Sequence, residues 1–273
     1  MPSIVLPSRR FLPPAVETLD PSNQFYPYDG DVYLGGMGLI GARTQTLATT
    51  VGGNLYARFG TVAGNAFDAS GQSGAAFLSS RSYTPPLNQT IFAVIRPTSW
   101  PASGIDRGKI VGGWTQAHLS GTGAPLGANA GLVISCPFQS FANYIPCDAC
   151  LTYSDGTSEI VDGPATTNSA NATKNPWFIS ISYKDASLLS FYSRDLVTGL
   201  ILSSSVSKTK SLKQASQPFS IFSSDPNSDT NNSWTGGLGT AYGLYVGWVA
   251  RAWTLTQLAQ LAANPWQIFR PQL

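Results

Sequence analysis

Charged side chains are scarce in this sequence. They make up 11% of its 273 residues, against about 25% in an average globular protein. The formal net charge is +2, and basic residues gather only at Arg9-Arg10 and in the segment SKTKSLK at 207–213. Nucleic-acid-binding proteins usually carry a larger basic patch, so the composition argues against a nucleic-acid partner.

Long apolar runs are missing as well. No uninterrupted stretch reaches the roughly 18–20 residues that a membrane-spanning helix needs. Prolines at positions 2, 7, 13 and 14 interrupt the region where a secretory signal would have its apolar segment. We therefore expect no membrane insertion and no signal peptide, and synthesis in the cytoplasm of the producing cell.

Cysteine and histidine are rare: the chain has three cysteines and one histidine, Cys136, Cys147, Cys150 and His118. These are the ligand types of a Cys₃His zinc site, although the spacing is not that of a zinc finger. A disulfide, either Cys147–Cys150 or Cys136–Cys147, is a second interpretation, and buried free thiols are a third. The sequence leaves all three open.

Only two glutamates occur, Glu17 and Glu159. Glycosidases usually need two carboxylates that flank the scissile bond. Asp155, Glu159 and Asp162 lie close together, but among Ser, Thr and Gly they are typical of a loop. His118 has no Ser- or Cys-centred motif around it. The sequence therefore predicts that the protein is not an enzyme.

Turn-forming and uncharged polar residues are abundant, with 27 glycines and 19 prolines. They separate short apolar or alternating segments that predict strands, at 54–60, 90–97, 108–114, 131–136, 177–183, 188–193, 200–206, 218–222 and 238–253. The run 90–97 is almost continuously apolar, which predicts a strand covered on both faces. We expect an all-β fold, an antiparallel two-sheet sandwich.

Residues 1–30 form a region of their own. Prolines fix its backbone and remove hydrogen-bond donors, which predicts an extended arm rather than a folded unit. Its apolar side chains need a surface to lie on, either the protein's own domain or a neighbour's. We predict an assembly role for five residues of this arm: Ile4, Leu6, Arg9, Arg10 and Phe11.

The chain ends in the only convincing helical pattern, at 254–263. Thr254 or Thr256 can cap this helix, and Leu255, Leu258 and Leu261 fall on one face. Pro265 ends it. We expect the apolar face to dock on the sandwich and the tail 264–273 to continue the contact, with Leu258, Trp266 and Phe269 as a clasp. The sandwich domain is thus predicted to span residues 31–273.

The order of these segments resembles a known family. FAVIRPTSW, GKIVGGW, and WFISISY followed by a turn and LLSFYSRDLVTG are similar to a laminin-G or concanavalin A-like lectin jelly roll. The opening MPSIVLPSRRFLPPAVETLDPSNQF and the ending ANPWQIF resemble those of tailed-bacteriophage virion proteins. The resemblance implies a non-enzymatic virion structural protein, a capsid decoration or a head or tail fibre component. It would be a homo-oligomer that contacts other virion proteins. The alternative is a virion module that binds a host glycan or receptor, and a glycan-degrading enzyme ranks third.

Two further segments suggest ligands. DPNSDTNN places oxygen ligands at alternate positions, Asp225, Asn227, Asp229 and Asn231, as a Ca²⁺ site would, and a simple Asx-turn loop is the alternative. No other cofactor is expected. Trp100 and Trp234 follow predicted strands or loops and are candidates for stacking on sugar rings, whereas Trp248 and Trp253 are expected in the core.

Overall fold

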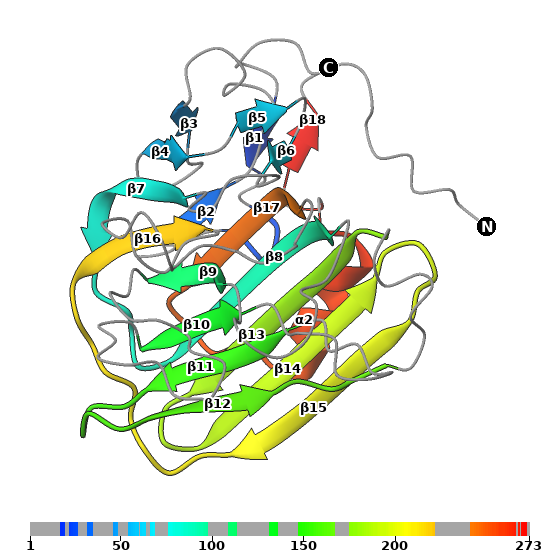
Figure 1. The fold of residues 1–273 in the computed structure, drawn as a ribbon. Coiled ribbons are helices and arrows are strands. Elements are labelled where there is room, and N and C mark those ends of the chain that lie inside the picture. The colour runs from blue at the N-terminus through cyan, green and yellow to red at the C-terminus, as the bar shows by residue number, and fades with distance from the viewer. Residues whose placement is uncertain are drawn as a thin grey trace.

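The computed structural model describes residues 17–19, 22–26, 32–34, 46–48, 54–59, 61–63, 66–68, 76–97, 109–113, 131–135, 147–166, 175–221, 241–265, 267 and 269–271. They form two large antiparallel sheets, a two-stranded ribbon and one helix (Figure 1). The predicted all-β antiparallel sandwich with a short C-terminal helix is confirmed.

Sheet I has the strand order β12-β11-β10-β9-β16-β7-β4-β3. In chain order its members are β3 (Thr46–Ala48), β4 (Asn54–Phe59), β7 (Ala76–Tyr83), β9 (Lys109–Gly113), β10 (Leu132–Ser135), β11 (Asp148–Thr152), β12 (Ser158–Asp162) and β16 (Gln217–Ile221).

Sheet II has the order β15-β14-β13-β8-β17-β6-β5, and β2 also pairs with β17. Its members are β2 (Val32–Leu34), β5 (Thr61–Ala63), β6 (Ala66–Asp68), β8 (Gln89–Pro97), β13 (Trp177–Lys184), β14 (Leu188–Asp195), β15 (Ile201–Ser207) and β17 (Ala241–Val249). Strands β12 and β15 end the two sheets on the same side of the molecule (Figure 1).

One apolar layer lies between the two sheets. Cys147, directly before β11, places its Sγ 3.5 Å from Oγ of Ser193 on β14, so these side chains meet across the sandwich. Side chains alternate along a strand, and Ala149 and Leu151 therefore share the inner face with Cys147. On β14 the buried Phe191 points to the same layer as Ser193. The sandwich is thus closed by alternating apolar residues from both sheets.

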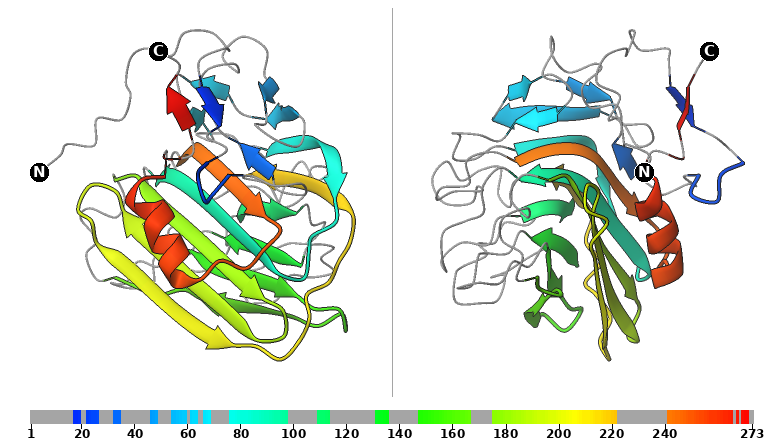
Figure 2. Two further views of the ribbon diagram at one scale, coloured as in Figure 1. Left: turned by 180° about the vertical axis from the view of Figure 1, so that it is seen from behind. Right: turned by 90° about the vertical axis from the view of Figure 1, so that its right-hand side faces the viewer.

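A second apolar layer lies between sheet II and the helix α2 (Leu255–Ala263). Figure 2 shows α2 on the side of sheet II that is turned away from sheet I. Leu258 and Leu261 are fully buried there, in one cluster with Phe92 and Phe178. Strand β8 is therefore covered on both faces, as its continuous apolar run predicts.

Thr254 is the N-cap of α2, and a capping box is complete. Its hydroxyl accepts a hydrogen bond from the backbone N–H of Gln257, and the Gln257 side chain accepts one from the N–H of Thr254. Of the two caps that the sequence allowed, the structure uses Thr254. The predicted burial of Leu258 is confirmed, the side chain of Phe269 is not described, and Trp266 lies outside the described residues.

The described part of the N-terminal region packs against the protein's own domain. Strand β1 (Glu17–Leu19) pairs with β18 (Phe269–Pro271), so these two strands from distant parts of the sequence lie side by side (Figure 2). Phe25 is 0% exposed, and its ring meets that of Trp253 edge-on at 5.1 Å. The domain boundary after residue 30 stays a prediction, but Phe25, which precedes it, packs in the apolar layer between sheet II and α2.

The strands predicted from apolar segments are present in the structure, whereas β7, β11, β12 and several three-residue strands were not predicted. The assignment of residues 158–162 to a loop is wrong, because this segment forms β12 and pairs along its length with β11. Four of the five residues of β12 are half-buried and none is fully buried, so the strand has no alternation of buried apolar and exposed polar residues that would predict it.

The cysteine predictions are partly resolved. Cys147 and Cys150 are both buried and neither takes part in a disulfide, so both predicted pairings, Cys147–Cys150 and Cys136–Cys147, are wrong. Three residues apart in an extended segment, the two side chains point to opposite faces of the sheet. Burial raises the pKa of Cys147 to about 12, so this thiol stays protonated and inert at neutral pH. Cys136 and His118 lie outside the described residues.

Candidate functional site

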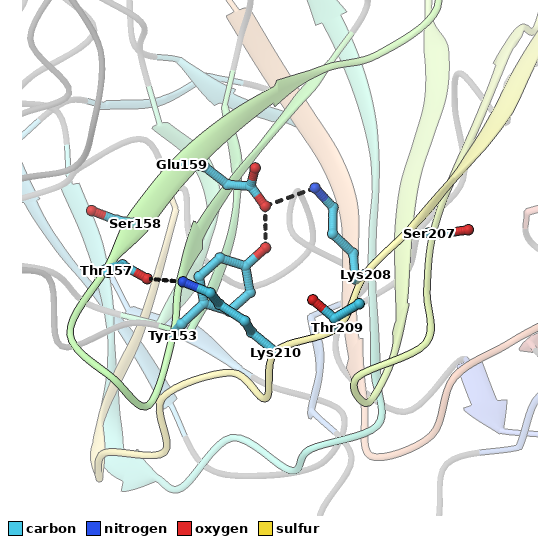
Figure 3. Close-up of a pocket in the computed structure, with 8 residues that line it drawn as sticks. All are labelled: Tyr153, Thr157, Ser158, Glu159, Ser207, Lys208, Thr209 and Lys210. Atoms are coloured by element: carbon cyan, nitrogen blue, oxygen red, sulfur yellow. Dashed lines mark hydrogen bonds and ion pairs between the residues drawn. The ribbon is translucent and has the colours of Figure 1, made fainter.

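A pocket of about 420 Å³ opens at the side of the sandwich where β12 and β15 end the two sheets (Figure 3). Its lining comes from the β11–β12 hairpin and from the segment that follows β15. The lining residues are Tyr153, Thr157, Ser158, Glu159, Ser207, Lys208, Thr209 and Lys210. All of them carry a hydroxyl, a carboxylate or an ammonium group.

The segment after β15 crosses from sheet II to sheet I and forms one wall of the pocket. The N–H of Lys208 donates to the carbonyl of Ser187 in the β13–β14 turn, at 2.9 Å. Farther along, Leu212 forms an isolated bridge with Tyr153, and the N–H of Lys213 donates to the carbonyl of Thr152 at 2.8 Å. Backbone hydrogen bonds to both sheets therefore fix this wall.

Glu159 is the centre of the first polar network. Nζ of Lys208 lies 2.7 Å from its Oε1, and the Tyr153 hydroxyl donates to the same oxygen. Burial raises the pKa of Glu159, but the hydrogen bonds from Lys208 and Tyr153 outweigh it, so the pKa is lowered. Burial and the hydrogen bond to Glu159 raise the pKa of Tyr153. At neutral pH Glu159 is thus an anion and Tyr153 a neutral donor.

Lys210 holds the second network. Its Nζ donates to Oγ1 of Thr157 at 2.9 Å, pairs with Asp155 at 2.9 Å and lies 5.4 Å from the centre of the Tyr153 ring. The hydrogen bonds from Thr157 and Lys210 lower the pKa of Asp155. The Tyr183 hydroxyl donates to the backbone carbonyl of Lys210 and so holds this segment in place.

This arrangement suits a neutral ligand with several hydroxyl groups. Each lysine of the pocket pairs with a carboxylate, so neither ammonium group needs an anionic ligand to balance its charge. Glu159 offers acceptor sites, and the lysines and hydroxyls offer donors around it. Charge-assisted hydrogen bonds to ligand hydroxyls are stronger than those between neutral groups.

Most residues predicted for ligand binding or for assembly lie outside the described part of the chain. This holds for Trp100 and Trp234, for the calcium candidates Asp225, Asn227, Asp229 and Asn231, and for the arm residues Ile4, Leu6, Arg9, Arg10 and Phe11. Within the described ranges no three metal-ligating side chains come together. Trp248 and Trp253 are buried, which confirms their expected place in the core.

The sequence pattern did not reveal the pocket. The sequence indicates Glu159 only as one of three acidic residues in a predicted loop, and Lys208 and Lys210 only as members of a basic run. Lys208 and Glu159, which form an ion pair in the pocket, are 49 residues apart in the sequence. Nothing local in either segment indicates that the edges of two different sheets meet there.

Solved structures share this fold at low sequence identity. The binding domain of botulinum neurotoxin DC in complex with SialylT matches with a TM-score of 0.55 and 14% identity, over 85% of this chain and 50% of that chain. The same domain in complex with rat synaptotagmin II matches with a TM-score of 0.54 and 12% identity, over 85% and 51%. The tailspike protein 2 enzymatically active domain of bacteriophage CBA120 has a TM-score of 0.45 and 16% identity, over 73% and 27%.

The chain spans about half the length of the neurotoxin domains that it matches. No protein-family model and no curated protein sequence matches it. In the described parts of the chain, no helix has the length and hydrophobicity to cross a membrane.

Proposed function

We propose that this chain is a non-enzymatic binding module that holds a carbohydrate in the pocket between the edges of the two sheets. The observation that carries the proposal is the lining, in which Glu159, Lys208 and Lys210 converge with hydroxyl groups and are held by fixed backbone. Preorganised polar groups lose little freedom when a ligand binds. The neurotoxin domain that shares the fold has been solved in complex with SialylT, which agrees with this use of such a sandwich.

The electrostatics of the pocket favour binding over catalysis. A glycosidase needs one carboxyl group with a raised pKa to protonate the leaving group. Here the pKa values of both Glu159 and Asp155 are lowered, so neither holds a proton at neutral pH.

A glycan array with the full chain, followed by calorimetry on the best ligand, tests the proposal. Glu159→Gln keeps the shape of the side chain but removes its charge, and Lys210→Met removes a donor. Each should weaken binding about tenfold or more, because hydrogen bonds to charged groups are lost. Lys184→Met, at an exposed lysine outside the pocket lining, is the matched control and should bind normally. Binding that both pocket variants retain would place the ligand elsewhere, with Trp100 and Trp234 as the next candidates.

The resemblance of the two chain ends to phage proteins supports a second, compatible proposal. We propose that the module is part of a virion, as a capsid decoration or a head or tail fibre component, and contacts other virion proteins through its arm. The apolar arm residues Ile4, Leu6 and Phe11 carry this proposal. Antibody labelling of intact particles tests it, and absence of the chain from purified particles would refute it.

A further inference from the structure

Strand β15 ends sheet II, and within the described residues it pairs only with β14. Its seven residues, ILSSSVS, are mostly exposed: Ile201 is 48% and Val206 37% exposed. The nearby turn residue Val197 is 66% exposed. An edge strand presents unpaired backbone N–H and C=O groups, and natural proteins usually protect such an edge.

Within the described residues, the strand itself carries none of the protective features that natural edge strands usually have. It contains no charged residue, no proline and no bulge in its pairing with β14. The edge of sheet I differs, because β12 has two acidic residues, Glu159 and Asp162, among five. At the other ends of the sheets, β3 and β5 have only three residues each. Among the described strands that end a sheet, β15 is thus the longest. It is also the one whose free edge offers the most backbone groups to a partner strand.

The sequence of β15 is self-complementary. When two identical strands run antiparallel about a two-fold axis through Ser204, Leu202 of one copy lies opposite Val206 of the other. This apolar pair occurs twice, on the face of sheet II that is turned toward sheet I. On the opposite face, Ser203 lies opposite Ser205 in the same way. A pairing offset by one residue is excluded. It would place Ile201 opposite Val206, although these two side chains point to opposite faces of sheet II.

We propose that β15 binds β15 of a second copy of this chain and joins the two sheets II into one continuous antiparallel sheet. The acidic residues of β12 would repel those of the other copy, so sheet I does not take part in the pairing. The two pockets, each beside the end of β15, then lie near the two-fold axis. This dimer is independent of the ligand that the pockets hold.

The experiment measures self-association of the full chain by sedimentation equilibrium, at concentrations up to about 1 mM, the weak end of specific binding. Ser203→Lys/Ser205→Lys places lysines opposite lysines across the two-fold axis. We expect the dissociation constant to rise about tenfold or more, because like charges directly opposite each other destabilise a strand pair. Ser203→Lys/Ser205→Glu places lysine opposite glutamate at both positions and should restore the dimer.

The two variants lose the same hydroxyls, including the Ser205 partner of Ser190 at 2.9 Å, and both carry a long charged side chain at position 205, of opposite sign. Ser216→Lys, at an exposed loop position, controls for added positive charge and should dimerise normally. Melting curves confirm that each variant is folded. A wild-type chain that stays monomeric throughout, a dimer that persists in the double lysine variant, or a failure of the lysine–glutamate variant to restore it would each overturn the proposal.

Discussion

Position 247 on β17 has room only for glycine. A Cβ atom at this position would lie 2.1 Å from Cζ of Phe92, a ring with no solvent exposure. Phe92 cannot move away, because its ring stacks on Phe178 at 5.8 Å and on Trp253 at 5.7 Å. The Phe92 ring therefore occupies the space that a side chain at position 247 would need. A larger residue would displace the aromatic layer under α2.

The ionisation of Glu159 makes stability depend on pH. Since its pKa is lower in the folded chain than in the unfolded chain, its contribution is present above the unfolded pKa of about 4.3 and is lost as the pH falls through the folded pKa. Between pH 7 and pH 3 the melting temperature of the wild type should fall more than that of Glu159→Gln. The side chain is 39% exposed, so the difference corresponds to about 1 kcal/mol or less.

Lys208→Met serves as a second variant in the same titration. It removes the ammonium group that pairs with the Glu159 carboxylate and should also reduce the loss of stability in acid. Melting temperatures measured in buffers of constant ionic strength provide the comparison. Parallel curves for the wild type and Glu159→Gln would show that the ion pair does not contribute to stability.

At the scale of the element, α2 depends on its capping box and on its apolar face. Thr254→Ala removes the hydroxyl that accepts from Gln257 and should lower the free energy of unfolding by about 0.5–2 kcal/mol. Thr256→Ala, two residues farther along and also exposed, removes the same hydroxyl from a helical position and should be neutral or slightly stabilising, since alanine is the better helix former. Urea unfolding measures both. Equal effects of the two substitutions would contradict the role of the cap.

The elements differ in how well the sequence predicts them. Strands such as β8 and β13 are buried on both faces, so their apolar runs stand out, and the Thr254–Pro265 signals predict α2. Strand β12 was missed because its residues are only half-buried. The pocket was missed because it depends on which strands end each sheet, a property of the topology that neither segment encodes locally.

For the whole molecule, the arm and the body can be separated by two truncations. Deletion of residues 1–16 leaves β1 and Phe25 in place, so the chain should melt like the full-length protein but fail to incorporate into particles. Deletion of residues 1–28 also removes Phe25 from its contact with Trp253 and should cost about 3–5 kcal/mol of stability, as loss of a buried phenylalanine does.

Thermal melting and incorporation into particles, measured on the same two truncated chains, distinguish the two roles. Normal incorporation after deletion of residues 1–16 would contradict the assembly role of the arm. Equal melting temperatures for both truncations would contradict the contribution of Phe25 to the core.

The position of β8 in sheet II has a consequence for how the chain folds. Its two neighbours are β13 and β17, and Val94 pairs with Phe178 on one side and Tyr245 on the other. The second contact joins residues about 150 positions apart, and such a high contact order slows folding. During translation β8 therefore stays unpaired on one side until β17 has left the ribosome. Until then its apolar edge is a site for chaperones to bind and for nascent chains to aggregate.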